Sequence, residues 1–449
     1  MSPTAVDPKL HVGPKEVHGV LGRHMLADGY DIVMDLKKSK GSWVHDAKKG
    51  RNLLDFFSNF ASCPIGYNHP RIDNTEFRER LVEASLNKPA NSDIYTTQMA
   101  EFVETFSRSI PESHRKHMFF VEGGSVGIEN ALKTAFDWKV RKNFKKGYDF
   151  EKGHQIMHLK ECFHGRTGYT LSLTNTADPR KTQYFPKFDW PRLSNPKLHF
   201  PANAAALEAA AHAEDETLAQ AKQFLMERHD DIAAFIMEPI QGEGGDNHFR
   251  TEFFRKVREL CDENDMLLIF DEVQTGVGLT GKMWAFEHFG VKPDLFTFGK
   301  KTQTCGFVSN DRIFDIPDNV FVVSSRINST WGGNLTDMVR AQRYFEIIEE
   351  ENLVDNAAKV GAHFLAGLDR LSEKFPGMVS NVRGRGLFCA FDLPSGDVRD
   401  KAINAMEENE LLVLSSGHRS IRFRPALNLS MDEASEGLKR MEKSLGQIG

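Results

Sequence analysis

Short apolar runs alternate with helix-like stretches between about residues 115 and 305, and this alternation constrains the fold more than any other feature. Runs of this kind are typical of strands buried on both faces, which occur in parallel sheets covered by helices. The sequence therefore predicts an α/β fold. The predicted strands are 117–121, 155–159, 232–237, 266–270 and 295–298, and the predicted helices between them are 126–141, 201–228 and 251–264.

The chain is 449 residues long, which exceeds the usual size of one compact unit. Beyond about residue 340 the pattern changes to helices mixed with short alternating strands, as in an α+β unit. We expect an N-terminal arm over residues 1–69 that joins the small domain, a large domain over 70–340, and a small α+β domain over 341–449.

The composition argues for a small-molecule ligand. The net charge is −6 and no block of like charge predicts a nucleic-acid or membrane surface. The five cysteines lie far apart without a C-x-x-C pair, so neither a metal site nor a disulfide framework is indicated. The first 15 residues are polar, and no apolar run approaches the roughly 20 residues of a membrane span. We expect a soluble cytoplasmic protein.

Two charged residues each close a predicted buried strand. Asp271 follows the strand 266–270, and Lys300 follows the strand 295–298 after one glycine. Ligands bind at the carboxyl ends of strands in open α/β sheets. A lysine can form an imine with a carbonyl compound, and a carboxylate can keep a pyridine nitrogen protonated, so the pair suits pyridoxal phosphate. A buried ion pair beside an ordinary strand-end lysine explains these two residues equally well.

A glycine turn follows the predicted strand 117–121. Gly124 and Ser125 lie in this turn just before the helix 126–141, where free backbone NH groups and the positive end of a helix could meet a phosphate. Turns also need glycine for conformational reasons alone. Phosphate binding and a plain turn therefore both remain open on this motif.

Two further segments carry side chains suited to ligands. Phe163 and Arg166 follow the strand 155–159, where a ring could stack on a cofactor and a guanidinium could bind a carboxylate. A core phenylalanine and a surface arginine are the commoner explanation. The loop 328–334, which includes Thr330, could contact a phosphate, line a subunit contact or form a simple turn.

Other local patterns predict strands at 30–33, 43–44 and 320–323 and a helix at 97–109. The Asn91-Ser92-Asp93 segment could cap that helix. Near the C-terminus, Arg422 and Arg424 would share a face if the strand 420–423 continued through both, although Pro425 could end it first.

A series of short motifs runs through the chain in a fixed order. Its most specific part is Asp271-Glu272-Val273-Gln274-Thr275-Gly276, Thr280-Gly281, Pro293-Asp294-Leu295 and Gly299-Lys300. Supporting motifs are Gly66-Tyr67-Asn68-His69-Pro70, Phe163-His164-Gly165-Arg166-Thr167, Glu238-Pro239-Ile240-Gln241-Gly242-Glu243-Gly244-Gly245 and Val382-Arg383-Gly384-Arg385-Gly386-Leu387. From about Leu53 to Asn428 the chain resembles the class III, or ω-amino-acid, aminotransferases. The resemblance implies a pyridoxal-phosphate enzyme of fold type I, with a mainly parallel seven-stranded sheet covered by helices and a smaller α+β domain.

Within this class the chain is most similar to the lysine ε-aminotransferases. That similarity lies in Val121-Glu122-Gly123-Gly124, Leu171-Ser172-Leu173-Thr174, Ser329-Thr330-Trp331-Gly332 and Arg422-Phe423-Arg424-Pro425. The chain also departs from the common class pattern at the Glu122 turn, at Val277, at Leu279 and at Trp331. These departures leave the cofactor assignment intact and bear mainly on the choice of substrate.

The resemblance implies a role for each cofactor residue. Lys300 would hold pyridoxal 5'-phosphate covalently and shuttle the proton, which requires a lowered pKa. Asp271 would pair with the ring nitrogen, Phe163 would stack on the ring, and Gln274 would lie near its phenolic oxygen. The phosphate would rest on the backbone of Gly124 and Ser125, with the hydroxyl of Thr330 supplied by the partner subunit of a homodimer with shared active sites.

The implied substrates are L-lysine and 2-oxoglutarate, and the products are 2-aminoadipate 6-semialdehyde, which cyclises to piperideine-6-carboxylate, and glutamate. Gln274 would lie beside the bound substrates. Arg166 would bind the distal carboxylate of either substrate, and Arg422 the carboxylate next to the reacting carbon of 2-oxoglutarate. Lysine has no carboxylate at that place, so Glu243 would neutralise Arg422 instead. We therefore expect a switch between Glu243 and Arg422.

Two alternatives stay open. The series from Asp271 to Lys300 does not distinguish lysine from ornithine, acetylornithine or 4-aminobutyrate as the amino donor. From a different class, the chain could be a non-catalytic relative that binds the cofactor for structure or regulation. The presence of Lys300 and the lack of a DNA-binding segment argue against that reading.

Overall fold

The computed structural model describes residues 11–72 and 74–449. Its largest sheet has seven strands in the order β3-β9-β8-β7-β6-β4-β5. The strands from β4 to β8 are parallel, while β9 runs antiparallel to both of its neighbours, so the predicted mainly parallel α/β sheet is confirmed. The strands are β3 His117–Val121, β4 Gln155–Leu159, β5 Arg192–Leu193, β6 Ile232–Met237, β7 Leu267–Asp271, β8 Leu295–Phe298 and β9 Cys305–Ser309.

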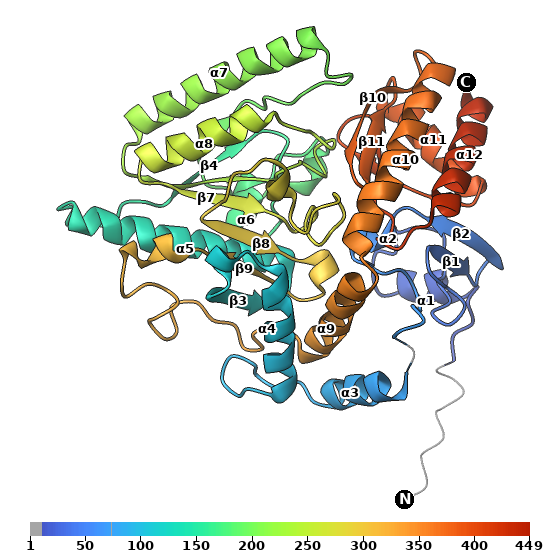
Figure 1. The fold of residues 1–449 in the computed structure, drawn as a ribbon, viewed down its shortest axis with the longest axis horizontal. Coiled ribbons are helices and arrows are strands. Elements are labelled where there is room, and N and C mark those ends of the chain that lie inside the picture. Colours follow the sequence, from blue (N-terminus) through green and yellow to red (C-terminus); the bar gives the residue numbers. More distant parts are fainter. Residues whose placement is uncertain (1–10, 73) are drawn as a thin grey trace, which may run out of the picture.

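Helices cover both faces of this sheet (Figure 1). Along β7, Leu268 and Phe270 belong to one apolar cluster with the buried face of α8, whereas Leu267 and Ile269 belong to a second cluster with α5. Successive side chains of a strand point to opposite faces, which explains this division. The helices of this part are α3 Thr75–Leu86, α4 Thr97–Ser109, α5 Gly124–Lys145, α6 Gly168–Leu173, α7 Ala204–Glu227, α8 Thr251–Glu263 and α9 Leu335–Glu350.

The remaining elements form a smaller unit beside the large sheet (Figure 1). A four-stranded sheet has the order β10-β11-β14-β13, and a three-stranded sheet has the order β1-β2-β12. In the second sheet Leu54 of β2 pairs in parallel with Leu411 of β12, so the N-terminal segment is built into the C-terminal unit. The elements are α1 Val17–Gly22, β1 Trp43–Asp46, β2 Arg51–Asp55, α2 Ser58–Ala61, α10 Leu353–Lys374, β10 Ser380–Arg385, β11 Phe388–Asp392, α11 Gly396–Glu408, β12 Leu411–Leu412, β13 Leu414–Ser416, β14 Ser420–Phe423 and α12 Met431–Ile448.

Several local predictions are wrong. Residues 320–323 form a turn instead of a strand, and residues 30–33 form no strand either. The helix α4 is capped by Thr96, whose side chain accepts a hydrogen bond from Met99 N at 3.2 Å, and not by the 91–93 segment. The expected domain boundaries stay predictions, and the second falls inside α9. Among the described residues, no helix combines the length and apolar character needed to cross a membrane.

Candidate active site

Asp271 and Lys300 lie at the same edge of the large sheet. Asp271 is the last residue of β7, and its register partner on the neighbouring parallel strand β8 is Thr297. The Thr297 hydroxyl donates to Asp271 Oδ1 at 3.2 Å. Lys300 begins a 3-10 turn, η5 Lys300–Thr302, shortly after β8 ends. The predicted juxtaposition of an acid and an amine at the carboxyl ends of two strands is therefore present.

The Asp271 carboxylate is almost fully buried and firmly held. Its Oδ2 atom lies 2.8 Å from His164 Nδ1, and its Oδ1 atom accepts from Val273 N at 3.1 Å. Burial lowers the pKa of His164, but Cys162 and Asp271 raise the pKa more strongly, to well above its usual value. His164 was not predicted as a functional residue, although it stands inside the Phe163 to Thr167 motif. Its position indicates that it fixes the Asp271 carboxylate.

The Lys300 amine lies in a largely desolvated environment. Burial lowers its pKa, while the nearby Asp271 carboxylate opposes that shift. A second acid, Glu238, lies close to this group, and burial raises its pKa to about 7. Glu238 accepts hydrogen bonds from the backbone of Phe163 and Gly242, both at 2.9 Å. Glu238 therefore joins the segment of the predicted stacking ring to the loop that carries Glu243.

The predicted phosphate turn is the first turn of α5. Ser125 Oγ lies 2.7 Å from the Thr167 hydroxyl and 2.8 Å from the Thr170 hydroxyl. A Cβ atom on Gly124 would lie 3.1 Å from the Val273 side chain, so the N-terminus of α5 packs directly against the residues that follow Asp271. The first backbone NH groups of a helix have no intrahelical acceptor and can bind an anion.

These residues fit pyridoxal phosphate. Asp271 supplies a buried carboxylate for a ring nitrogen, and Lys300 supplies an amine with a lowered pKa. The N-terminus of α5 supplies the phosphate donors on a segment that packs against the same strand ends. An amine, a carboxylate and an anion site thus meet at one edge of the sheet.

Two arginines of the smaller unit reach the same region. Arg422 in β14 is buried, and burial, followed by the nearby Arg424, lowers its pKa to about 10. Its Nε atom donates to the Ser415 carbonyl and its Nη1 atom to Gln274 Oε1, both at 3.1 Å. Arg424 also donates to Gln274 Oε1, at 2.9 Å. The structure therefore brings the predicted residues Gln274 and Arg422 into contact.

The other predicted substrate residues are placed differently. Glu243 forms an ion pair with Lys181 instead of Arg422, and its Oε2 atom is buried without a hydrogen-bond partner among the described residues. Arg166 is exposed and makes no hydrogen bond or ion pair within the described part of the chain. Thr330 is also exposed, in a loop whose backbone accepts from Ser92 at 3.3 Å. The single chain thus leaves Arg166 and Thr330 free to meet other groups.

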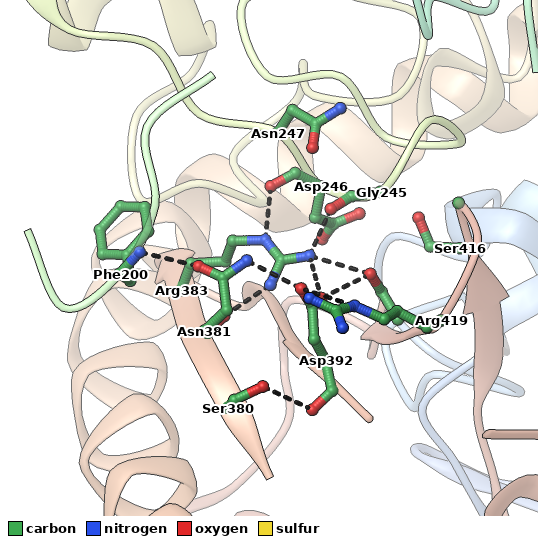
Figure 2. A network of polar contacts seen from close by, with 12 residues as sticks. Phe200, Gly245, Asp246, Asn247, Ser380, Asn381, Arg383, Asp392, Ser416 and Arg419 are labelled. Carbon is green, nitrogen blue, oxygen red and sulfur yellow. Dashed lines mark hydrogen bonds and ion pairs between the residues drawn. The ribbon is translucent and has the colours of Figure 1, made fainter. Parts of the chain in front are cut away.

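The loop that carries Glu243 is clamped onto the four-stranded sheet. Figure 2 shows the Arg383 guanidinium between the backbone of Gly245 and Asp246 and the carboxylate of Asp392. The ion pair from Arg383 to Asp392 measures 2.8 Å, and both side chains are buried. Arg424 adds a two-point ion pair to the Asp246 carboxylate, at 2.6 and 2.9 Å. The sequence motifs contained Arg383, but its role as a clamp was not predicted.

Comparisons with known proteins agree with this geometry. The profile of the family "Aminotransferase class-III" matches residues 25–445. The L-lysine-epsilon aminotransferase of Mycobacterium tuberculosis is 52% identical over 433 residues, which cover 96% of each chain, and that of Amycolatopsis lactamdurans is 47% identical over 447 residues, which cover 98% of each. A solved structure of lysine aminotransferase from M. tuberculosis in the internal aldimine form superposes with a TM-score of 0.95 at 51% identity, covering 98% of this chain and 100% of that one. The chain therefore belongs to the class-III aminotransferases.

Proposed function

We propose that this protein transfers the ε-amino group of L-lysine to 2-oxoglutarate, giving 2-aminoadipate 6-semialdehyde and glutamate. The observation that carries the proposal is the identity of about half of all residues, over almost the full length of both chains, with proteins named L-lysine-epsilon aminotransferase. The buried Arg422 supports an α-keto acid as the amino acceptor, because its guanidinium can bind the carboxylate of such an acid.

Class-III aminotransferases use pyridoxal phosphate, and this chain has the residues to hold it. When bound, the cofactor would supply a protonated pyridine ring that serves as an electron sink for the substrate carbon that bears the reacting amino group. Asp271 would hold the ring nitrogen and Phe163 would lie on the ring face. Gly124 and Ser125 would hold the phosphate from the N-terminus of α5, together with Thr330 of a second subunit.

Lys300 would move the proton. Burial lowers the pKa of its amine, which favours the neutral form of Nζ that can take a proton from the substrate carbon. The same Nζ would then return the proton to the neighbouring acceptor carbon. Gln274 Oε1 is already occupied by two arginines, which leaves its amide NH₂ group free to donate to the cofactor or the substrate.

The substrates would be bound by their carboxylates. Arg166 is exposed and lacks a carboxylate partner in the described structure, as a residue that binds the distal carboxylate of either substrate would require. Arg422 would bind the carboxylate next to the keto group of 2-oxoglutarate. With lysine bound, Glu243 would neutralise Arg422, because an unpaired buried charge is costly.

A donor assay tests the proposal. Lysine, ornithine, acetylornithine and 4-aminobutyrate are each offered with 2-oxoglutarate, with the Lys300→Ala protein as the blank. We expect glutamate and a cyclic imine from lysine, since its aldehyde product carries an amine that can close a six-membered ring. Turnover of one of the other amines with lysine inert would assign a different donor. Inactivity with all four would support a non-catalytic cofactor-binding protein.

We infer that the functional unit is a homodimer in a reducing compartment such as the cytoplasm. Ile94 and Tyr95 are 69% and 75% exposed, and Trp331 on a second segment is 43% exposed. The Asn91 backbone NH donates to the Trp331 carbonyl and so joins the two segments. A second copy would cover this apolar face and receive Thr330. All five cysteines are unpaired, which suits a reducing environment. Sedimentation analysis of the wild type and of Tyr95→Glu tests the dimer, and only the substituted chain should be monomeric.

A further inference from the structure

The partner of Glu243 in this structure is unexpected. Lys181 ends a short 3-10 turn, η3 Pro179–Lys181, and its amine contacts Glu243 Oε1. Both side chains are partly exposed, at 31% and 18%. The backbone of Glu243 is fixed, because its carbonyl accepts from Gly417 N at 2.8 Å and the preceding carbonyl accepts from the Ser416 hydroxyl at 2.7 Å. Only the side chain of Glu243 can therefore change partner.

Among the described residues, Arg422 has no carboxylate partner in the same arrangement. Its hydrogen bonds go to a neutral amide, Gln274, and to the Ser415 carbonyl. Burial and then Arg424 lower the pKa of Arg422, while the charges of Asp246 and then Glu243 oppose that shift. Glu243 thus acts electrostatically on Arg422, and in this structure its carboxylate pairs with Lys181.

We propose that Lys181 is a positioning residue that holds Glu243 away from Arg422 while Arg422 binds the carboxylate next to the reacting carbon of the keto acid. This inference rests on the proposed function. It adds Lys181 to the switch between Glu243 and Arg422 that the sequence analysis expects. With the keto acid bound, each cation has its own carboxylate. With lysine bound, Glu243 turns to Arg422 and Lys181 is left without a partner.

The two cations differ in what they lose when unpaired. Lys181 lies near the surface, where solvent replaces the lost ion pair at little cost. Arg422 is buried, and in the substrate-free structure its charge is met by hydrogen bonds to Gln274 and the Ser415 carbonyl. A lysine substrate that disturbs these contacts brings no carboxylate in exchange, so the Arg422 charge becomes costly unless Glu243 joins it. Release of Glu243 from Lys181 therefore costs little. Because this cost is small, the bound substrate can determine which cation Glu243 pairs with. A buried lysine in place of Lys181 would hold Glu243 too firmly for the exchange.

The Lys181→Gln enzyme tests the inference. Without the amine, Glu243 joins Arg422 in the free enzyme, and 2-oxoglutarate must displace it. We expect the KM for 2-oxoglutarate to rise about three- to fivefold, with the KM for lysine unchanged or lower and kcat little changed. Glutarate has both carboxylates of 2-oxoglutarate and no keto group. Its dissociation constant from the cofactor-loaded enzyme, measured by calorimetry, should rise by the same factor.

Two substitutions serve as matched controls. Arg180→Gln removes the neighbouring cation of the same turn, which pairs with Asp178, and should leave both KM values unchanged. Lys181→Arg keeps the charge and should restore glutarate affinity. An equal loss with both substrates, or a similar effect of Arg180→Gln, would show that Lys181 only stabilises the turn and would overturn the inference.

A double-mutant cycle separates this inference from the proposed function. In the Glu243→Gln background, Lys181→Gln should cause no further change in glutarate affinity, because the carboxylate that both cations share is gone. An equal effect of Lys181→Gln with and without Glu243 would overturn the inference. The proposed function fails instead if the wild-type enzyme produces no glutamate from lysine, a result independent of Lys181.

Discussion

Two walls of one site are built in different ways. The cofactor wall lies at the ends of β7 and β8, where the buried Asp271 receives hydrogen bonds from His164, Val273 and Thr297. The substrate wall joins a loop after β6 to the four-stranded sheet, and its carboxylate, Glu243, pairs with a partly exposed lysine. The first wall holds its carboxylate with three hydrogen bonds, whereas in the second we propose that Glu243 can pair with either of two cations.

This difference matches the proposed tasks of the walls. A cofactor that stays in place through many turnovers needs one fixed geometry, which buried hydrogen-bonded groups on strand ends provide. Two substrates that differ by one carboxylate need a wall whose charge can be rearranged at small cost. Variants of the two walls should therefore differ both in the size of their effects and in whether the two half-reactions are affected equally.

The largest effect is expected for Lys300→Ala. The loss of the proton-transfer amine should lower turnover by about 10⁴-fold in both half-reactions. Glutamate formation measures the loss, and a rise in melting temperature on adding pyridoxal phosphate checks that the site still binds the cofactor. Substantial remaining activity would assign the proton transfer to another amine, of which the adjacent Lys301 is the obvious candidate. Lys301 donates to the Gln274 carbonyl at 2.7 Å.

Asp271→Asn should come next. An amide keeps the shape of the side chain but removes the charge opposite the ring nitrogen, and we expect both half-reactions to slow by about 10²- to 10³-fold. Rapid-mixing measurements with each substrate alone provide the two rates. As a control, Thr297→Val removes only the 3.2 Å hydrogen bond to this carboxylate and should cost less than about tenfold. If both variants slow the half-reactions by similar factors, Asp271 contributes through its position and not through its charge.

Arg383→Met breaks the clamp beneath the substrate wall. It leaves the buried Asp392 without the 2.8 Å ion pair and frees the carbonyls of Gly245 and Asp246, so the free energy of unfolding should fall by about 3 kcal/mol. Denaturant unfolding measures the change. Arg419→Met is the matched control, because Arg419 is half exposed and lies 3.8 Å from the same carboxylate. Its effect should stay within about 0.5 kcal/mol.

The smallest effect of the four is expected for Glu243→Gln. This variant should also show the largest difference between the two half-reactions. Lysine then leaves the buried Arg422 without a neutralising carboxylate, and the donor half-reaction should slow about tenfold. The keto-acid half-reaction should change by less than about twofold, because 2-oxoglutarate brings its own carboxylate. Single-turnover rates with each substrate measure both effects. Equal loss in the two halves would remove the switch between Glu243 and Arg422.

The cofactor wall could be predicted largely from local sequence. Strands β3, β4, β6 and β8 begin and end where their apolar runs do, because strands buried on both faces are apolar almost throughout. Asp271 and Lys300 stand directly at or beyond such ends, so their meeting follows from the parallel order of the strands. Strand β9 was missed because Gly306 interrupts its apolar run.

The substrate wall could not be predicted in the same way. Lys181 and Glu243 lie on two loops, and no periodic pattern brings a pair of loop residues together. Arg424 lies just beyond β14, where strand geometry no longer fixes its direction, and it pairs with Asp246 on the other unit. The wrong strand at 320–323 has a related cause: Val322 is 58% exposed, and an apolar run alone does not distinguish a buried strand from an exposed turn.

The parallel pairing of β2 with β12 has a consequence for synthesis on the ribosome. Leu54 is synthesised 357 residues (411 minus 54) before its pairing partner Leu411. At about 5–20 residues per second, this interval lasts on the order of tens of seconds. During that time β1 and β2 lack their third strand, so the nascent chain exposes a sheet edge to which chaperones or other chains could bind. We therefore expect slower growth or added chaperones to raise the yield of soluble protein, even if the folded protein is stable.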